Sequence, residues 1–401
     1  MMKNGEGVMD ISSKINFNDN RFLMFVIDDM ANHMEYEEGK KVIRMTLGKS
    51  ELPLHKDIRE AMSGSIEDFK KSSLVYPGGL PELKRALSNY YKEYYHVEIN
   101  EKNFIISPGT SAAFRNLFTL LSVPGDDVLI PKPYYSLYRF SSLLSGASTK
   151  YYTIDKNTRR VDMDSFKQNF TERTKIVVIN TPGNPLGNVL TDEELYEMDS
   201  IVNDRAVIIN DEIYSNVYFD QESKSVLNLK NTKSVFITTN AFSKAYGMYS
   251  RRVGYCIVPD ELVEPLTVIQ HHTLLTVDPI VQFGAITALQ NQNEVQELVI
   301  RYKKRRDYTM KVLSGVPYIK PIYSEGGFYI TLDCEEYMKK YNYKTSFDLA
   351  VKILDDKLVA TVPGSDFGLP YTLRLSFSTS HYNEGILLLK EFFNTGVMYG
   401  N

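Results

Sequence analysis

Two near-continuous apolar runs constrain the fold of this chain more than any other feature. Residues 175–180 read Lys-Ile-Val-Val-Ile-Asn, and residues 206–210 read Ala-Val-Ile-Ile-Asn. Strands buried on both faces of a parallel sheet show such runs, whereas a half-exposed strand alternates apolar and polar residues. Both runs end in polar residues, and ligands of open α/β sheets bind beyond the carboxyl ends of the strands. The runs therefore favour an α/β fold with a ligand site at that edge.

The composition indicates an ordinary globular protein. Of 401 residues, 43% are hydrophobic, which is enough for a substantial core. Lys and Arg number 46 against 50 Asp and Glu, so no excess of charge favours a nucleic-acid or membrane partner. Cys256 and Cys334 are too few for a disulfide framework, and residues 1–6 lack the apolar core of a signal peptide. We expect a cytoplasmic protein with reduced thiols.

A lysine and an arginine lie between two further apolar runs. Residues 235–239 precede the segment that contains Lys244 and Arg252, and residues 253–258 follow it. An amine acts as a nucleophile only when part of it is neutral, and a nearby guanidinium favours the neutral form. Arg252 is also suited to bind an anion. For an isolated pair with this spacing, a solvated turn would be the more common explanation.

A glycine and two hydroxyl residues open an apolar-periodic helix. Gly109-Thr110-Ser111-Ala112 follows the apolar run 104–106. The start of a helix offers free backbone N–H groups and a favourable dipole to a phosphate, and the hydroxyls add donors. The alternative is that Thr110 or Ser111 caps the helix without any ligand.

In this order and spacing, the motifs resemble those of the class I and II aminotransferases, fold-type-I enzymes that use pyridoxal 5′-phosphate (PLP). Ser-Lys-x-x-Gly at 243–247 and Arg-x-Gly-Tyr at 252–255 are similar to the lysine signature of that family. The resemblance implies that Lys244 carries PLP as an internal aldimine and that Arg252 binds its phosphate. Ala241 departs from the family pattern, which usually has a phosphate-binding serine at this position.

The same resemblance implies the other contacts to the cofactor ring. Asp211 would keep the pyridine nitrogen protonated, so that the ring accepts electrons, although a carboxylate here could instead cap a helix. Asn184, in an Asn-Pro-Leu-Gly turn, and Tyr214 would bond the phenolic oxygen. The chain has no Trp, so Tyr135 is expected to stack on the ring, with Tyr134 as the alternative. The residues expected at the phosphate are Gly109, Thr110, Ser111, Ala112, Ser243 and Arg252.

Substrate and subunit contacts are also implied by the resemblance. Arg374, in a Leu-Arg-Leu-Ser-Phe segment, would bind the substrate α-carboxylate together with Asn184, since a guanidinium suits a bidentate contact. Gly48 would contribute a backbone contact. Tyr76 would reach the phosphate of the other subunit in a homodimer with shared active sites, although the spacer after it is two residues shorter than in the family. Without the resemblance, a strand arginine, a turn glycine and a core tyrosine explain these residues equally well.

The expected organisation has two domains. A large PLP-binding domain would span residues 60–295, with a mostly parallel sheet between helices. Both chain ends, residues 1–59 and 296–401, would form a smaller α+β domain, because strand-type patterns return after residue 326. His271 and His272 are adjacent, but they have no acidic or thiol partners at ligand spacing, so we expect no metal site.

The implied function is a PLP-dependent aminotransferase that moves an amino group between an L-amino acid and a 2-oxo acid. Lys244, Asp211 and Tyr214 are the expected catalytic residues. One alternative is a PLP-dependent lyase or cyclase of the aminocyclopropane-carboxylate synthase type, which the Pro-Tyr-Tyr run at 133–135 also resembles. A PLP-sensing transcription regulator is less favoured, because about 40 residues before the first matching strand leave little room for a DNA-binding domain.

Overall fold

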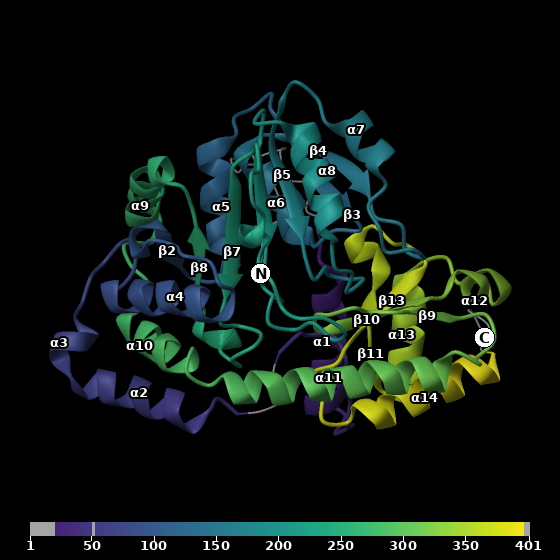
Figure 1. Cartoon of the computed structure of the whole chain (residues 1–401). Helices are drawn as coiled ribbons and strands as arrows, with labels where there is room; N and C mark the ends of the chain where they lie inside the picture. Colours follow the sequence, from purple (N-terminus) through teal and green to yellow (C-terminus); the bar gives the residue numbers. More distant parts are fainter. Residues whose placement is uncertain (1–20, 50–52, 397–401) are drawn as a thin grey trace, which may run out of the picture.

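A seven-stranded sheet forms the centre of the molecule. The computed structural model describes residues 21–49 and 53–396, so the segment 1–6 discussed above lies outside the described residues. The strand order is β2-β8-β7-β6-β5-β3-β4, and every neighbouring pair is parallel except the two that involve β8. Its strands are β2 (Phe104–Ser107), β3 (Asp127–Lys132), β4 (Ser148–Thr153), β5 (Thr174–Asn180), β6 (Val207–Asp211), β7 (Phe236–Ala241) and β8 (Gly254–Ile257). The predicted, mostly parallel sheet is confirmed (Figure 1).

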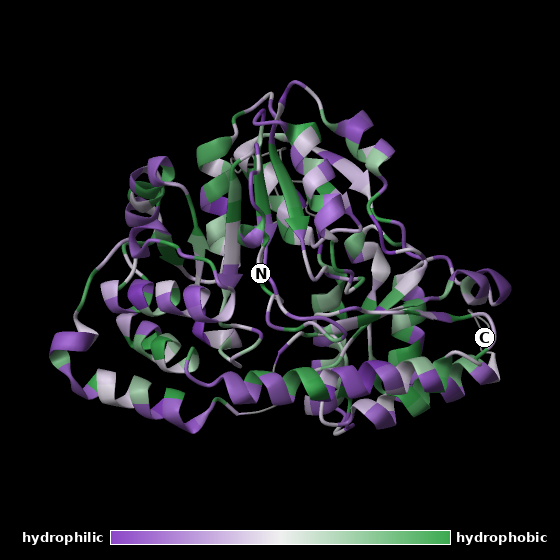
Figure 2. Ribbon diagram, viewed as in Figure 1, coloured by the Kyte–Doolittle hydropathy of each residue, from purple (hydrophilic) through white to green (hydrophobic). Residues whose placement is uncertain are grey.

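Helices cover both faces of this sheet, which explains the apolar runs. Successive residues of β5 point to opposite faces, and Ile176 and Val177 are both fully buried. Ile176 packs in one cluster with Phe114 of α5, and Val177 packs in another with Phe166 of α7. Figure 2 shows the central strands mainly in hydrophobic colours. The covering helices are α5 (Thr110–Leu121), α6 (Ser136–Ser145) and α9 (Asp260–Leu274) on one face, and α7 (Met163–Asn169) and α8 (Asp192–Val202) on the other.

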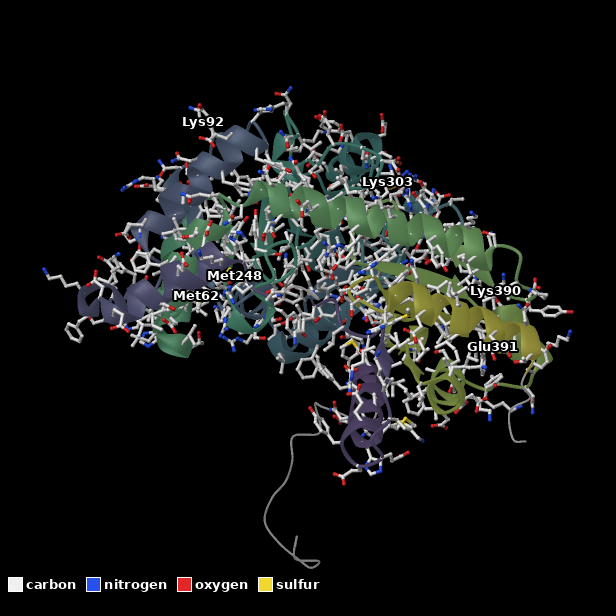
Figure 3. The ribbon with its side chains drawn as sticks, turned by 90° about the horizontal axis from the view of Figure 1, so that it is seen from below. Met62, Lys92, Met248, Lys303, Lys390 and Glu391 are labelled. Carbon is white, nitrogen blue, oxygen red and sulfur yellow. The ribbon has the colours of Figure 1, made fainter. Side chains whose placement is uncertain are left out.

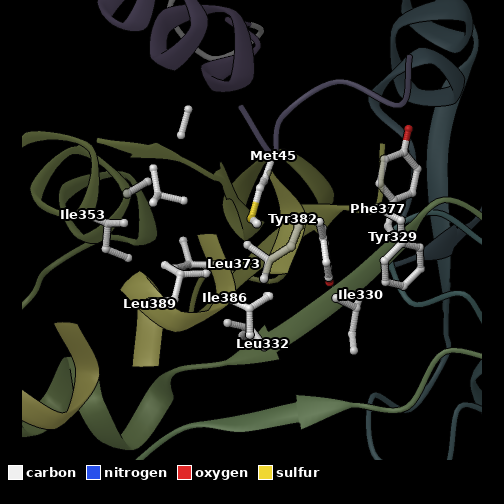
Figure 4. Packing of buried hydrophobic residues seen from close by; sticks show 14 of the residues in the cluster. Met45, Tyr329, Ile330, Leu332, Ile353, Leu373, Phe377, Tyr382, Ile386 and Leu389 are labelled. Atoms are coloured by element: carbon white, nitrogen blue, oxygen red, sulfur yellow. The ribbon is translucent and has the colours of Figure 1, made fainter. Parts of the chain in front are cut away.

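A second, antiparallel sheet lies beside the first and is built mostly from the C-terminal part of the chain. Its order is β12 (Val362–Pro363), β13 (Thr372–Ser376), β10 (Tyr329–Asp333) and β9 (Lys320–Ile322). Figure 4 shows Leu332 of β10 and Leu373 of β13 beside Ile386 and Leu389 of α14. The helices that pack on this core include α11 (Gln292–Leu313), α13 (Ser346–Lys357) and α14 (Tyr382–Thr395).

The N-terminal residues join this second region. Strand β1 (Ile43–Arg44) pairs in parallel with β11 (Val359–Ala360), and α1 (Leu23–Tyr36) packs against β12 and α13. The remaining helices are α2 (Lys56–Glu67), α3 (Phe69–Ser72), α4 (Pro81–Tyr94), α10 (Pro279–Ala288) and α12 (Glu335–Lys340), and the 3-10 helices η1 (Glu101–Asn103), η2 (Val226–Asn228), η3 (Tyr249–Arg251) and η4 (Gly364–Phe367).

Two continuous helices cross the expected domain boundaries. The boundary at residues 59 and 60 falls inside α2, and the boundary at residues 295 and 296 falls inside α11. In Figure 3, α11 runs along the lower face of the molecule, with Lys303 on it, and Met62 marks α2. Within the described residues, no helix is both long and apolar enough to cross a membrane.

Candidate active site

Strand direction brings the expected residues to one edge of the large sheet. Strands β2, β3, β5, β6 and β7 run the same way, so their carboxyl ends meet. Asp211 ends β6, and Lys244 lies three residues beyond β7. Strand β8 runs in the opposite direction, so Arg252, just before it, lies at the same edge. A cavity of about 830 Å³ opens there. The expected residues that line it are Gly48, Thr110, Ser111, Tyr135, Asn184, Asp211, Tyr214, Ser243, Lys244, Arg252 and Arg374.

Three expected residues do not line this cavity. Gly109 lies behind Arg252, and a Cβ atom on it would be 2.4 Å from Nη2 of that arginine. Ala112 is half-buried in the first turn of α5. Tyr76 lies outside the cavity with 41% of its surface exposed, and its backbone N–H donates to Thr276 Oγ1 at 3.3 Å. Within one chain, Tyr76 therefore makes no contact with the site.

Asp211 is a buried carboxylate at the end of β6. Its Oδ2 accepts a hydrogen bond from the Tyr138 hydroxyl at 2.8 Å, and its Oδ1 accepts one from the backbone N–H of Ile213 at 3.2 Å. Burial raises the pKa of Asp211 to about 6, and the two hydrogen bonds oppose this rise. The next helical segment after β6 is η2, so Asp211 does not cap a helix. Tyr138 was not predicted, although it lies three residues after Tyr135 at the start of α6.

Lys244 is a buried amine. Its Nζ donates to the backbone carbonyl of Gly48 at 2.7 Å. Burial lowers the pKa of Lys244 below its ordinary value, and the positive charges of Arg374 and Arg252 lower it further, while Tyr329 opposes them. The sequence pattern predicts that the guanidinium of Arg252 lowers this pKa. The structure corrects that explanation, because removal from water is the larger cause.

Tyr329 lies beside the site, although its sequence context does not predict this. It is the first residue of β10, and its hydroxyl lies 3.3 Å from the Tyr214 hydroxyl. Burial raises the pKa of Tyr329, but the charges of Lys244 and Arg374 outweigh burial, so the pKa lies below its ordinary value. The Gly-Gly-Phe-Tyr start of this strand predicted a strand and carried no signal that its tyrosine faces the lysine.

Arg374 connects the two sheets. It lies in β13, opposite Thr331 of β10, and its side chain is buried. Nη1 donates to Asn184 Oδ1 at 3.1 Å, and Nη2 donates to the Thr46 carbonyl at 2.6 Å. Its Nε is buried and has no hydrogen-bond partner among the described residues. A buried guanidinium with an unsatisfied N–H is suited to a carboxylate ligand.

The expected phosphate residues form a cradle around the start of α5. Thr110 and Ser111 open this helix of 12 residues. Arg252 adopts a left-handed backbone conformation with φ of 51°, and its Nη1 lies 3.4 Å from Ser243 Oγ. The glycine at 109 lets the guanidinium approach, since any side chain would fill that space. Helix N–H groups, hydroxyls and a guanidinium thus surround one volume, and this donor set fits a phosphate. Ala241 is buried at the end of β7 and brings no hydroxyl to it.

Tyr135 and Tyr134 both line the cavity. The Tyr135 ring meets the Tyr138 ring edge to face at 5.9 Å, whereas the Tyr134 ring lies 5.5 Å from that of Tyr151. Tyr135 therefore contacts Tyr138, whose hydroxyl donates to Asp211. This contact favours Tyr135 over Tyr134 as the residue expected to stack on the cofactor ring. Among residues 21–49 and 53–396, no group of three or more His, Cys, Asp or Glu side chains is arranged to hold a metal ion.

Known proteins resemble this chain in sequence and in structure. A family model described as "Aminotransferase class I and II" matches residues 40–387. A protein of Aquifex aeolicus named "Probable aspartate/prephenate aminotransferase" is 31% identical over 363 residues, which cover 88% of this chain and 91% of that protein. The aspartate aminotransferase of Sulfurisphaera tokodaii is 28% identical over 377 residues, or 92% of this chain and 94% of that protein. The solved structure of alanine aminotransferase from Pyrococcus furiosus matches with a TM-score of 0.87 at 25% identity, and the match covers 96% of this chain and 100% of that one.

Proposed function

We propose that this chain, which belongs to the class I and II aminotransferase family, uses Lys244 as its reactive amine and Asp211 as the acid partner of its cofactor. The chain is a PLP-dependent aminotransferase, which moves an amino group between an amino acid and a 2-oxo acid. None of the similar proteins named above is a lyase or a cyclase. One observation supports the assignment of residues: the carboxylate of Asp211, the amine of Lys244 and the guanidinium of Arg252 surround one cavity. Gly109 leaves the space that the Arg252 guanidinium occupies.

PLP supplies an electron-accepting ring that stabilises negative charge at the α-carbon of the substrate. Lys244 would hold the cofactor and, once the substrate amine has displaced it, would move a proton between the substrate α-carbon and C4′ of the cofactor, as general base and then as general acid. A lysine must be partly neutral for this role, and burial lowers the pKa of Lys244. Asp211 holds the proton on the pyridine nitrogen. The positive charge of the protonated pyridine nitrogen would also compensate the cost of burying the negative charge of Asp211.

The other residues position the two ligands. Arg374 and Asn184 bind the substrate carboxylate, with the backbone of Gly48 as a further contact. Tyr214 bonds the phenolic oxygen of the cofactor, and Tyr135 stacks on its ring. The phosphate is bound by Thr110, Ser111, Ser243 and Arg252, with Gly109 and Ala112 supplying the backbone around it.

We also propose a homodimer in which Tyr76 contacts the cofactor of the other subunit. Support comes from the surface around Tyr76, where large apolar side chains are exposed on α2, on α3, directly before Tyr76, and on α9 and just after it. These are Ile66, Phe69, Val75, Val268, Leu274 and Leu275. Sedimentation equilibrium of the holoenzyme tests the dimer, and a monomer at micromolar concentration would contradict it.

Two further assignments belong to the same proposal. The first is a division into two domains, with residues 60–295 in the large domain and residues 1–59 and 296–401 in the small one. Its boundaries lie inside α2 and α11. A cytoplasmic location is supported by Cys256 and Cys334, because both are buried and neither forms a disulfide. Roles in amino-acid metabolism and biosynthesis follow from the reaction.

The amine is tested by absorption spectroscopy of the purified protein after reconstitution with PLP. The wild type is expected to show a visible band that Lys244→Ala loses, and amino acids should convert the wild-type spectrum. Lys84→Ala is a matched control, because burial also lowers the pKa of Lys84 while its side chain does not line the cavity. Loss of the band in the control alone, or no band in the wild type, would contradict the proposal.

A further inference from the structure

We propose that this aminotransferase acts on amino acids with a large apolar side chain, and that Phe22 determines this preference. The inference rests on the proposed function, since it takes Arg374 as the carboxylate site and Lys244 as the reactive amine. Three phenylalanine rings, Phe367, Phe22 and Phe25, form an aromatic wall that leads away from Arg374.

The aromatic wall is continuous. The Arg374 guanidinium carbon lies 4.7 Å from the centre of the Phe367 ring. The Phe367 and Phe22 ring centres are 6.3 Å apart, and those of Phe22 and Phe25 are 5.6 Å apart, both edge to face. Phe22 also meets Tyr135 edge to face at 6.5 Å. Phe22 and Phe25 line the cavity, and 53% of the Phe25 surface is exposed, whereas Phe367 is fully buried and supports Phe22 from outside the cavity lining. The wall therefore runs from the carboxylate site to the cavity mouth.

Contacts with the second sheet region hold Phe22 in place. Phe22 directly precedes α1, and the first two N–H groups of that helix donate to the carboxylate of Asp366, from Leu23 at 2.9 Å and from Met24 at 2.8 Å. The N–H of Phe25 donates to the carbonyl of Phe22 at 3.1 Å. A carboxylate that accepts helix N–H groups and favours the positive end of the helix dipole fixes the start of the helix. The ring of Phe22 is thus presented to the cavity by a defined backbone.

A substrate whose carboxylate and amine are both bound has a fixed orientation, so its side chain extends in one direction. Its carboxylate meets Arg374 and its amine lies near Lys244, so the side chain extends along the aromatic wall. Leu137 and Phe140 of α6 also line the cavity and add apolar surface, and Phe140 is 36% exposed. An apolar side chain covers the rings that line the cavity and removes them from water, which favours binding in proportion to the area covered.

Among the described residues, no further buried cation lines the cavity that could pair with an acidic side chain. Four charged groups are assigned to the cofactor and the carboxylate: Asp211, Lys244, Arg252 and Arg374. In the described part of the chain, the other charged side chains that line the cavity are Arg21, Arg139 and Asp366. Arg139 interacts with the Tyr151 hydroxyl, and Arg21 is exposed, so water and salt screen its attraction. Asp366 would repel a second carboxylate.

The test compares kcat/KM of the holoenzyme for phenylalanine, leucine and methionine with that for aspartate, glutamate and alanine. The apolar group is expected to exceed the acidic pair at least tenfold. Phe22→Ala should lower kcat/KM for phenylalanine at least tenfold, by the magnitude that loss of apolar contacts in a pocket produces, and should change that for alanine less than threefold. Phe22→Leu, which keeps apolar volume, should lie between the wild type and Phe22→Ala.

Tyr36→Ala is the matched control, since Tyr36 ends the same helix and is 83% exposed away from the cavity. Thermal melting and the visible spectrum verify that each variant folds and binds PLP. Faster turnover of aspartate or glutamate, or equal losses for phenylalanine and alanine in Phe22→Ala, would overturn the inference while the aminotransferase function stands. A wild-type holoenzyme whose spectrum no amino acid converts would instead contradict the proposed function.

Discussion

The Tyr138 hydroxyl donates a hydrogen bond of 2.8 Å to Oδ2 of Asp211. The two residues are 73 positions apart, and both are buried. A hydrogen bond to the charged form of a carboxylate lowers its pKa, so Tyr138 works against the burial that raises the pKa of Asp211. Tyr138 therefore favours the ionised form of Asp211, which the proposed contact with the pyridine nitrogen requires.

Replacing Tyr138 by Phe is expected to raise the pKa of Asp211 and to lower kcat roughly tenfold, the effect of one hydrogen bond to a charged group. The acidic limb of the kcat/KM profile should move to higher pH. Tyr152→Phe is the control, because its buried hydroxyl donates to the Val178 carbonyl outside the cavity. An unchanged acidic limb in Tyr138→Phe would contradict the role of Tyr138.

Gly109→Ala should weaken PLP binding. A Cβ atom at residue 109 would lie 2.4 Å from Arg252 Nη2, and φ of 77° is strained for any residue with a side chain. Strain of this kind costs about 1–3 kcal/mol, so the Kd for PLP should rise roughly tenfold or more. Spectral titration of the apoenzyme measures this Kd. Gly315→Ala, where a Cβ would meet no atom within 4 Å, should leave it unchanged, and equal effects at both glycines would contradict the cradle.

Arg374→Lys should weaken substrate binding without altering the bound cofactor. Lysine keeps the positive charge but loses the planar fork that holds a carboxylate through two N–H groups. We expect kcat/KM to fall about tenfold to a hundredfold, with an unchanged visible spectrum. Arg85→Lys on α4, where 65% of the arginine side chain is exposed, is the control. If Arg374→Lys instead loses the spectrum and retains kcat/KM in the remaining holoenzyme, the carboxylate assignment is wrong.

The titration of Glu212 should make the free energy of unfolding depend on pH. Its Oε1 accepts hydrogen bonds from Asn210, Ser225 and Val226, while Oε2 is buried without a partner among the described residues. Burial raises the pKa of Glu212 to about 7, above its ordinary value of 4.5. A group whose pKa is higher in the folded state loses its stabilising contribution as pH rises through the folded pKa. Stability should therefore fall between about pH 4.5 and pH 7.

Glu212→Gln removes this titration. At pH 8 the variant should be more stable than the wild type by up to about 3 kcal/mol, from the pKa difference, and the gain should vanish near pH 4.5. Urea unfolding of the holoenzyme at both pH values measures it. Glu261→Gln, at an exposed position of α9, should show no such dependence. A gain of equal size at both pH values would show that proton binding by Glu212 is not its cause.

Local sequence patterns predicted the part of the site that belongs to the large sheet. Burial on both faces imposes near-continuous apolar runs, and each parallel strand places its next residues at the same edge. The runs that precede Asp211, Asn184 and Lys244 therefore predicted their place at this edge, and the family resemblance supplied the roles expected of them. Arg252 joins them because β8 runs in the opposite direction, a fact that strand patterns do not contain.

The antiparallel sheet and the covering helices contribute residues that local patterns do not identify. Tyr138, Tyr329 and Phe22 come from a helix, a strand and the start of another helix, and each reads as an ordinary core residue. In a chain with 28 tyrosines and 20 phenylalanines, residue type alone does not distinguish those that face a cavity. Their roles depend on which surfaces pack together over long sequence separations.

The sequence by itself determined the α/β architecture and the order of the chemical groups along it, because strand burial and helix starts are written in short stretches of residues. The tertiary structure decided which groups act on one another: Tyr138 on Asp211, Tyr329 on Lys244, and the aromatic wall on the space beside Arg374. It also decided that burial, more than Arg252, lowers the pKa of Lys244. Removal of a charge from water depends on everything packed around it, and that packing exists only in the folded chain.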